Sequence, residues 1–129
     1  MNRPSSCGLR HVALKVCDLP VMRGFYVDVM GFTVEWEPDA QNTYLTSGTD
    51  NLALHEVPEV HGPGSLDHIG IVVKKPVDVD EWASYLKTKG VLLTAEPKTH
   101  RDGARSLYFR DPENNGIQII FHPPISDKM

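Results

Sequence analysis

The chain has 129 residues, of which 40% are hydrophobic and 23% are charged, and these proportions are ordinary for a compact globular protein. A formal net charge of −4 offers no basic surface for counterion release, so the composition argues against nucleic acid as a partner. The chain has no apolar run near the roughly 20 residues that span a bilayer, and its polar start lacks the apolar part of a secretory signal, so we expect a cytoplasmic protein without membrane contact.

The first half of the chain begins with a predicted strand at 11–16, HVALKV, in which aliphatic residues alternate with other types. A helix is predicted over 18–30, because Asp18 can cap its start, Pro20 suits its first turn and Gly31 can end it. Beyond the glycine the hydrophobic period falls to two. This period predicts strands at 32–36, 43–47 and 51–57. The first half therefore reads as βαβββ.

The second half repeats this order. The segment HIGIVV at 68–73 resembles HVALKV with an offset of 68 − 11 = 57 residues, nearly half the chain. A helix is predicted over 78–89, with Asp78 and Glu81 spaced as a capping box and Gly90 at its end. Three further strands are predicted at 91–96, 106–110 and 116–122. The second half is therefore also βαβββ.

The two halves are joined by a segment rich in proline and glycine, PEVHGPGS at 58–65, which predicts a linker. We interpret residues 1–129 as a single domain of the α+β class, with modules at about 9–57 and 66–122. The last residues, 123–129, are expected to be a frayed tail.

Two histidines occupy matching positions in the repeat. Alternation along a strand puts His11 and Ala13 on the face away from the helix, and it does the same for His68 and Gly70. Small residues beside imidazoles leave a hollow into which the rings can point. Gln118 of the last strand shares this face in the second half. A lone strand histidine is usually structural, but a matched pair around a hollow favours a ligand site.

These features resemble the vicinal oxygen chelate superfamily, which includes glyoxalase I, bleomycin-resistance proteins, fosfomycin-resistance enzymes, methylmalonyl-CoA epimerase and extradiol dioxygenases. The resemblance covers nearly the whole chain and rests on the paired modules, on FYVDVMGFTV at 25–34 and on LDHIGIVV at 66–73. YFRDPENNGIQI at 108–119 is its most specific part. The resemblance implies a mixed sheet that curls around a cleft, usually completed by homodimerisation, in which a divalent metal sits.

By position, the resemblance implies His11 and His68 as metal ligands, with Gln118 in the place where the family most often has glutamate. The family's fourth place falls on Ala53, which cannot bind a metal, and His55 two positions later is an alternative. Two imidazoles and an amide form a neutral donor set, which favours zinc, nickel, cobalt or ferrous iron over magnesium or calcium. The missing glutamate also leaves no obvious general base.

Two functions are compatible with these residues. The first is a metal-dependent enzyme of the lyase, isomerase or dioxygenase type, in which the ion polarises vicinal oxygens of a small-molecule substrate. The second is a metal-free, drug-sequestering protein of the bleomycin-resistance kind, with Trp36, Tyr44 and Tyr108 as cleft walls. We predict Tyr44, Tyr108 and Arg105 as substrate-binding residues, since Arg105 and Arg110 flank SLYF and are placed to meet an anionic group.

The remaining histidines are not predicted to bind the metal. His61 and His100 fall in predicted loops and are expected to be solvated. His122 lies four positions beyond Gln118, about 13 Å along a strand, so it cannot share that residue's metal.

Overall fold

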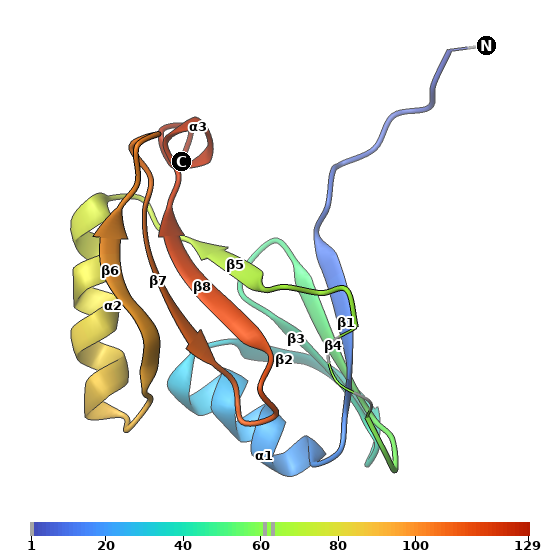
Figure 1. Cartoon of the computed structure of the whole chain (residues 1–129). Helices are drawn as coiled ribbons and strands as arrows, with labels where there is room; N and C mark the ends of the chain where they lie inside the picture. The colour runs from blue at the N-terminus through green and yellow to red at the C-terminus, as the bar shows by residue number, and fades with distance from the viewer. Residues whose placement is uncertain (1, 61, 63) are drawn as a thin grey trace. The chain divides into compact units, whose positions relative to one another are not determined.

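The structure is a computed structural model that describes residues 2–60, 62 and 64–129 (Figure 1). Its backbone divides into two compact units, Met1–Val60 and His61–Met129. The division falls inside the predicted linker, and each unit holds one four-stranded sheet. That the two units form a single domain stays a prediction. In the described part of the chain, no helix is both long and apolar enough to cross a membrane.

The first unit has the predicted βαβββ order. Its elements are β1 (His11–Val16), α1 (Leu19–Gly24), the π-helical turn η1 (Phe25–Val29), β2 (Thr33–Asp39), β3 (Asn42–Thr46) and β4 (Asn51–Glu56). The strands lie in the order β1-β4-β3-β2, with β1 parallel to β4 and the other neighbours antiparallel. The second half of the predicted helix is therefore a π-helix, as the bond from the Met30 amide to the Phe25 carbonyl shows.

The helix of the first unit is fixed at its start by two carboxylates. The Asp18 side chain accepts a hydrogen bond from the Val21 amide at 3.2 Å, as expected for a helix cap. Glu56 of β4 accepts from the Leu19 amide at 2.9 Å and so links the helix to the sheet. Gly31 follows the helix with φ 80°, a conformation that a residue with a side chain rarely adopts.

Alternation in β1 and β4 separates the two faces of the first sheet. Leu14, Val16 and Leu54 are buried on the side of α1, and each fully buried aliphatic side chain stabilises the fold by about 1.5–3 kcal/mol. His11 and Ala13 point to the opposite face and are exposed. The sheet thus presents its histidine away from the core, as the sequence predicts.

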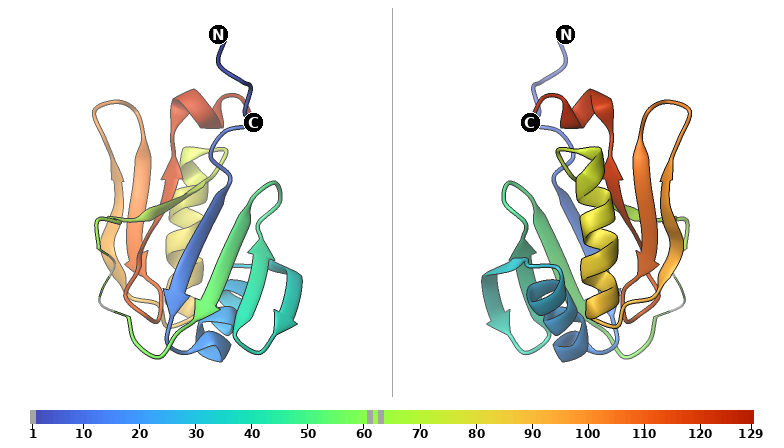
Figure 2. Two further views of the ribbon diagram at one scale, coloured as in Figure 1. Left: turned by 90° about the vertical axis from the view of Figure 1, so that its right-hand side faces the viewer. Right: turned by 90° about the vertical axis from the view of Figure 1, so that its left-hand side faces the viewer.

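The second unit repeats the order and adds a short final helix. Its elements are β5 (Ile69–Val72), α2 (Pro76–Thr88), β6 (Leu93–Thr99), β7 (Arg105–Arg110), β8 (Gly116–Phe121) and α3 (Pro123–Ser126). The strands lie in the order β5-β8-β7-β6, with β5 parallel to β8. Figure 2 shows α1 and α2 each lying along one face of the sheet of its own unit. Both units therefore share the predicted α+β plan.

The start of α2 differs from the prediction. The helix begins at Pro76, and Asp78 is its third residue, whose carboxylate accepts a hydrogen bond from the Lys75 amide at 3.0 Å. The predicted capping box of Asp78 and Glu81 is therefore wrong, because Asp78 is the third residue of the helix and not its N-cap. Its amide donates to the Lys75 carbonyl while its carboxylate accepts from the Lys75 amide. Proline suits this first turn, since its missing amide hydrogen has no helical partner there.

The C-terminal residues are not frayed, and that prediction is wrong. They form α3, and Ser126 is only 4% exposed. Its hydroxyl donates to the Val73 carbonyl at 2.7 Å and accepts from the His122 amide at 3.0 Å. Pro123 and Pro124 in the first turn fix helical backbone angles, so a helix as short as this can form once the serine hydroxyl holds it.

Candidate functional site

A row of paired residues crosses each sheet on the face away from its helix. We name these rows the first-unit row and the second-unit row. The first-unit row comprises Ala13, Ala53, Tyr44 and Trp36. The second-unit row comprises Gly70, Gln118, Tyr108 and Ala95. The repeat thus keeps a small residue and a tyrosine at equivalent places in both rows, while the amide and the indole each occur in one row only.

His68 precedes β5 and is held in one orientation. Its Nδ1 lies 2.6 Å from Asp67 Oδ1, and its ring packs edge-on against Tyr108 with 5.2 Å between centroids. A ring nitrogen that faces a carboxylate oxygen carries the proton, so the neutral ring has its lone pair on Nε2. The side chain is 32% exposed. The lone pair on His68 Nε2 can therefore coordinate a metal or accept a hydrogen bond from a ligand.

Gln118 lies in β8 beside this histidine and is only 8% exposed. Its Nε2 donates a hydrogen bond to the Tyr108 hydroxyl at 2.8 Å, which leaves Oε1 as a second donor atom for a metal. Oε1 lies against Gly70, where an added Cβ would come within 3.6 Å of it. The small residue in β5 thus gives the amide oxygen room.

Gly116, at the start of β8, positions the backbone that carries His68. A Cβ at this position would lie 2.7 Å from the Asp67 carbonyl oxygen and 3.3 Å from the His68 Cβ. The first contact is too close for a real side chain and the second is tight, so any other residue would push the two segments apart. The absence of a side chain here allows the close approach that places His68.

His11 in the first unit has an equivalent arrangement built from other residues. Its Nδ1 lies 2.7 Å from Oδ1 of Asn51, its neighbour in the parallel pairing of β1 and β4. The Asn51 amide nitrogen donates in turn to Glu35 Oε1 at 3.2 Å, which fixes the amide oxygen toward the histidine. His11 therefore also has its lone pair on Nε2 in the neutral ring, and it is exposed.

The family's fourth ligand place has no donor atom. Ala53 pairs with Ala13 as Gln118 pairs with Gly70, so the alanine is the counterpart of the glutamine in the first unit. His55 lies two positions later, and its Nδ1 is 2.6 Å from Asn42 Oδ1. That His55 replaces the missing ligand stays a prediction.

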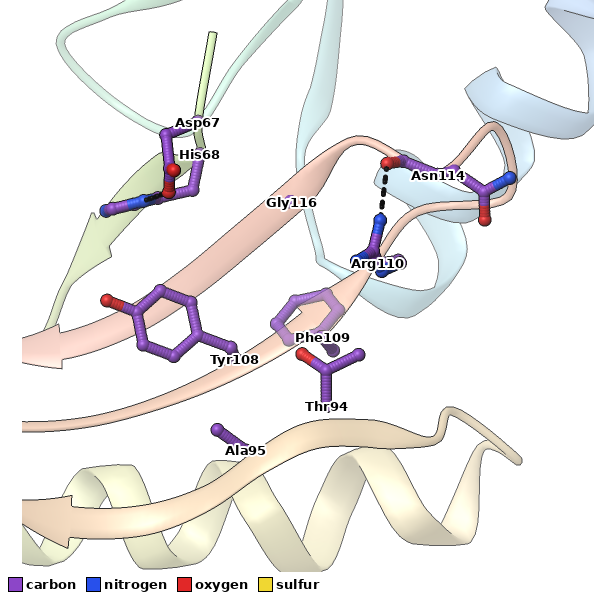
Figure 3. Close-up of a pocket in the computed structure, with 9 residues that line it drawn as sticks. All are labelled: Asp67, His68, Thr94, Ala95, Tyr108, Phe109, Arg110, Asn114 and Gly116. Atoms are coloured by element: carbon purple, nitrogen blue, oxygen red, sulfur yellow. Dashed lines mark hydrogen bonds and ion pairs between the residues drawn. The ribbon is translucent and has the colours of Figure 1, made fainter. Parts of the chain in front are cut away.

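A pocket opens on the second unit beside His68, and Figure 3 shows Asp67, His68 and Tyr108 toward one end and Arg110 and Asn114 toward the other. Its volume is about 260 Å³. Its lining residues are Asp67, His68, Thr94, Ala95, Tyr108, Phe109, Arg110, Asn114 and Gly116. The predicted ligand His68 and the predicted substrate residue Tyr108 thus line one cavity. Thr94 and Asn114 have no sequence signal that marks them.

Arg110, and not Arg105, lines this pocket. The Arg110 guanidinium is 3.4 Å from the Asn114 carbonyl oxygen. Arg105 instead donates to both Asp80 oxygens of α2, at 3.1 and 2.6 Å, and so lies on the helix side of the sheet, away from Tyr108. Hydrogen bonds from Arg105 lower the pKa of Asp80, and the Asp80 carboxylate raises the pKa of Arg105. The role of Arg105 in substrate binding stays a prediction. Tyr44 lies in the first unit and is not among the residues that line this pocket, so its role in substrate binding also stays a prediction.

The other histidines are placed as follows. His61 lies outside the described residues. His100 is half-buried rather than solvated, with Nε2 2.9 Å from the Ser106 hydroxyl. Over residues 2–60, 62 and 64–129, no group of three or more His, Cys, Asp or Glu side chains could hold a metal ion. Among these described residues, a metal site would need a donor of another type, and Gln118 is one.

Sequence reasoning did not find the residues that orient the histidines. Asp67 stands next to His68 in the chain, so an adjacent carboxylate was a usable signal. Asn51 lies 40 residues from His11, and only the register of β1 against β4 brings them together. Such partners are visible only once the strand pairing is known.

The comparison with protein families agrees with this geometry. The model of the Glyoxalase/Bleomycin resistance protein/Dioxygenase superfamily matches residues 8–119. The chain belongs to this superfamily.

Relatives of this superfamily member cover nearly its whole length. The metallothiol transferase FosB of Bacillus licheniformis is 28% identical over 125 residues, which are 92% of this chain and 78% of that protein. An integron cassette protein from the mobile metagenome of the Halifax Harbour sewage outfall is 27% identical, with a TM-score of 0.79 over 91% of this chain and 100% of the other. A lactoylglutathione lyase from Agrobacterium tumefaciens has the same TM-score at 19% identity, covers 95% of this chain and 98% of its own, and shows the shared fold.

Proposed function

We propose that this superfamily member is a metal-dependent enzyme that acts on a small substrate with vicinal oxygens. His11, His68 and Gln118 would hold the ion, which is zinc, nickel, cobalt or ferrous iron. The main support for the proposal is that the Nδ1 atoms of both histidines face oxygen acceptors, at 2.7 and 2.6 Å. The lone pairs of both Nε2 atoms therefore remain available to coordinate a metal ion. The proposal requires His11 to reach the face that carries His68 and Gln118.

The donor set fits a late first-row ion. Imidazole nitrogen suits these ions better than it suits magnesium or calcium, and the Gln118 amide adds an oxygen without adding charge. When bound, such an ion supplies Lewis-acid polarisation of substrate oxygens. The residues of the chain then orient the substrate: Tyr108 lines the pocket, and Arg110 places a positive charge at its other end.

The similarity to FosB favours one reaction type within this class. That relative is a metallothiol transferase, and it aligns over 92% of this chain. We therefore propose transfer of a thiol to the substrate ahead of the lyase, isomerase and dioxygenase reactions that the superfamily also contains.

A metal-free binding protein of the drug-sequestering kind is the second candidate. The neutral donor set favours it, because no carboxylate offsets the charge of an ion. The stack of Trp36 on Tyr44, with ring centroids 5.2 Å apart, also favours it as a wall for an organic ligand.

Titration calorimetry on chelator-treated protein separates the two candidates. We expect the wild type to bind one zinc, nickel, cobalt or ferrous ion per chain, and His68→Ala to abolish binding. Gln118→Glu should tighten binding by about tenfold or more, because it adds a charged ligand. His122→Ala is the matched control and should bind as the wild type does. If neither the wild type nor Gln118→Glu takes up any of these ions, the enzyme proposal fails and the binding-protein candidate replaces it.

A further inference from the structure

His55 of the first unit is held by a relay of side chains that the proposed metal site does not use. The Asn42 amide nitrogen donates to both Asp39 oxygens, at 2.8 and 3.1 Å. The amide oxygen of Asn42 must then face His55, whose Nδ1 lies 2.6 Å from it. Since an amide oxygen only accepts, the His55 Nδ1 carries the proton. His55 Nε2 therefore bears the lone pair of the neutral ring and can accept a hydrogen bond.

Two aromatic rings lie beside His55 on the same face of the sheet. Tyr44 packs edge-on against the imidazole, with 5.7 Å between ring centroids. The Trp36 indole stacks on Tyr44 with centroids 5.2 Å apart and planes inclined by 24°. Trp36 is nevertheless 58% exposed, so much of the indole is open to a further ring. The cluster thus combines a stacking surface with a fixed hydrogen-bond acceptor.

This cluster is separate from the proposed metal ligand of the same unit. In the parallel pairing of β1 and β4, His11 is opposite Asn51 and Lys15 is opposite His55. The two histidines are therefore four residues apart along the strands, about 13 Å. The second-unit row has Ala95 where the first has Trp36, so the stacking surface belongs to the first unit.

The charges around the cluster select against an anionic ring. Strand β2 carries Glu35, Glu37 and Asp39 around Trp36. Each has a partner in the unit: Glu35 accepts from Asn51, Glu37 pairs with Arg23, and Asp39 accepts from Asn42. Arg23 offsets the charge of Glu37, and Lys15 lies opposite His55 in the strand pairing, whereas Asn51 and Asn42 are uncharged. Three carboxylates and two cations leave a net negative charge, so an uncharged ring suits the surface better than a carboxylate-bearing one.

We propose that Trp36, Tyr44 and His55 form a subsite for an uncharged aromatic ring that bears a hydroxyl or N–H group. The ring stacks on the indole, and its polar hydrogen is donated to His55 Nε2. Asn42 and Asp39 are positioning residues, because they act only through the orientation of His55. The subsite does not depend on a bound metal, so it stands or fails separately from the proposed enzymatic function.

A matched pair of probes tests the hydrogen bond and the stacking surface separately. 4-Methoxyacetophenone carries a methyl group in place of the hydroxyl hydrogen of 4-hydroxyacetophenone. Binding of each probe to metal-free protein is followed by saturation transfer to the probe's own NMR signals, a readout that also works for a variant without Trp36. We expect the hydroxyl probe to bind about threefold to tenfold more tightly to the wild type, the worth of one neutral hydrogen bond. His55→Phe should remove this preference and leave binding of the methoxy probe within about twofold. Trp36→Ala should weaken both probes.

Two further variants protect the test against simple misfolding. Val34→Ala changes the same strand on the opposite face, where Val34 pairs with Leu45, and should leave both affinities unchanged. Asn42→Leu should lower the preference for the hydroxyl probe, and nitrogen-15 shifts of the His55 ring should show loss of the fixed Nδ1–H form. The proposal is overturned if the wild type binds neither probe, including the case in which a second copy of the chain covers Trp36. It is also overturned if His55→Phe keeps the preference.

Discussion

Glycine at two places in the second unit shows how the lack of a side chain positions a functional one. At Gly70 an added Cβ would sit 3.6 Å from Gln118 Oε1, an ordinary contact distance. At Gly116 it would sit 2.7 Å from the Asp67 carbonyl oxygen, which is backbone and cannot rotate away. The two glycines thus differ: Gly70 leaves space for an amide, while Gly116 is required for the strand pairing that carries His68.

This difference predicts opposite results for two alanine variants. Gly116→Ala should destabilise the protein by about 1–3 kcal/mol, because overpacking forces β8 away from the segment before β5. Gly70→Ala should change stability by less than about 0.5 kcal/mol, because its new methyl group fits. Urea unfolding at neutral pH measures both. Equal stability of Gly116→Ala and the wild type would contradict the close approach at Asp67.

At the scale of elements, each helix is attached to its sheet by polar contacts as well as by apolar packing. Val79, Ala83 and Leu86 of α2 are buried. Beyond this apolar face, Asp80 makes a two-point pair with Arg105 of β7, the geometry in which a carboxylate and a guanidinium interact best. The short α3 is attached to the strand end at Val73 by the Ser126 hydroxyl.

The Asp80 pair predicts a pH-dependent contribution to stability. Because the hydrogen bonds from Arg105 hold the pKa of Asp80 below its ordinary value of 3.8, the folded state binds this proton less readily than the unfolded state. The contribution is therefore present in full above that ordinary value and is lost as the pH falls through the lowered one. Asp80→Asn should be less stable than the wild type at pH 7, and the difference should shrink toward zero in acid.

Urea unfolding across this range, with Glu81→Gln as a control for an exposed carboxylate on the same helix, checks the prediction. A wild-type advantage over Asp80→Asn that persists unchanged below about pH 2 would refute it.

The contacts of α3 predict that the chain end contributes to the stability of the second unit. Ser126→Ala removes two part-buried hydrogen bonds, to the Val73 carbonyl and from the His122 amide, which should cost about 1–3 kcal/mol in total. Ser84→Ala, at an exposed position of α2, should change stability by no more than about 0.5 kcal/mol. Thermal or urea unfolding compares the two, and equal stability would mean that the tail does not pack in solution.

At the scale of the whole molecule, the two units of the repeat share their strand pairing but differ in the side chains at equivalent positions. Both units pair their first strand in parallel with their last, and both carry a histidine where the first strand begins. The rows differ, since one has Gln118 where the other has Ala53 and one has Trp36 where the other has Ala95. The amide ligand Gln118 of the proposed metal site therefore lies in the second unit, and the stacked pair of Trp36 and Tyr44 lies in the first.

The superfamily resemblance leads us to predict a homodimer. Modules this small have few side chains to wall a cleft, and two-fold pairing of subunits supplies the rest. Light scattering at micromolar concentration should give twice the chain mass of 14.4 kDa. A mass near that of one chain would count against the dimer.

The sequence by itself determined the elements and the faces they present. Period-two and period-3.6 patterns depend only on neighbouring residues, so they predict the βαβββ order and the outward position of His11 and His68 without any knowledge of pairing. Alternation alone also puts Arg110 on the face of Tyr108. The same local patterns failed at the chain end, because the Ser126 hydroxyl that holds α3 donates to a carbonyl 53 residues away.

Only the tertiary structure decided which polar atoms of the functional side chains remain available to bind a ligand. The tautomers of His11 and His55 depend on Asn51 and Asn42, which lie 40 and 13 residues away and reach them through strand register. Arg105 is engaged by Asp80, which is 25 residues distant on a helix. Hydrogen bonds of this kind are directional and form between partners that no local pattern specifies. Composition and periodicity fix where a side chain points, and the packed fold fixes what that side chain can bind.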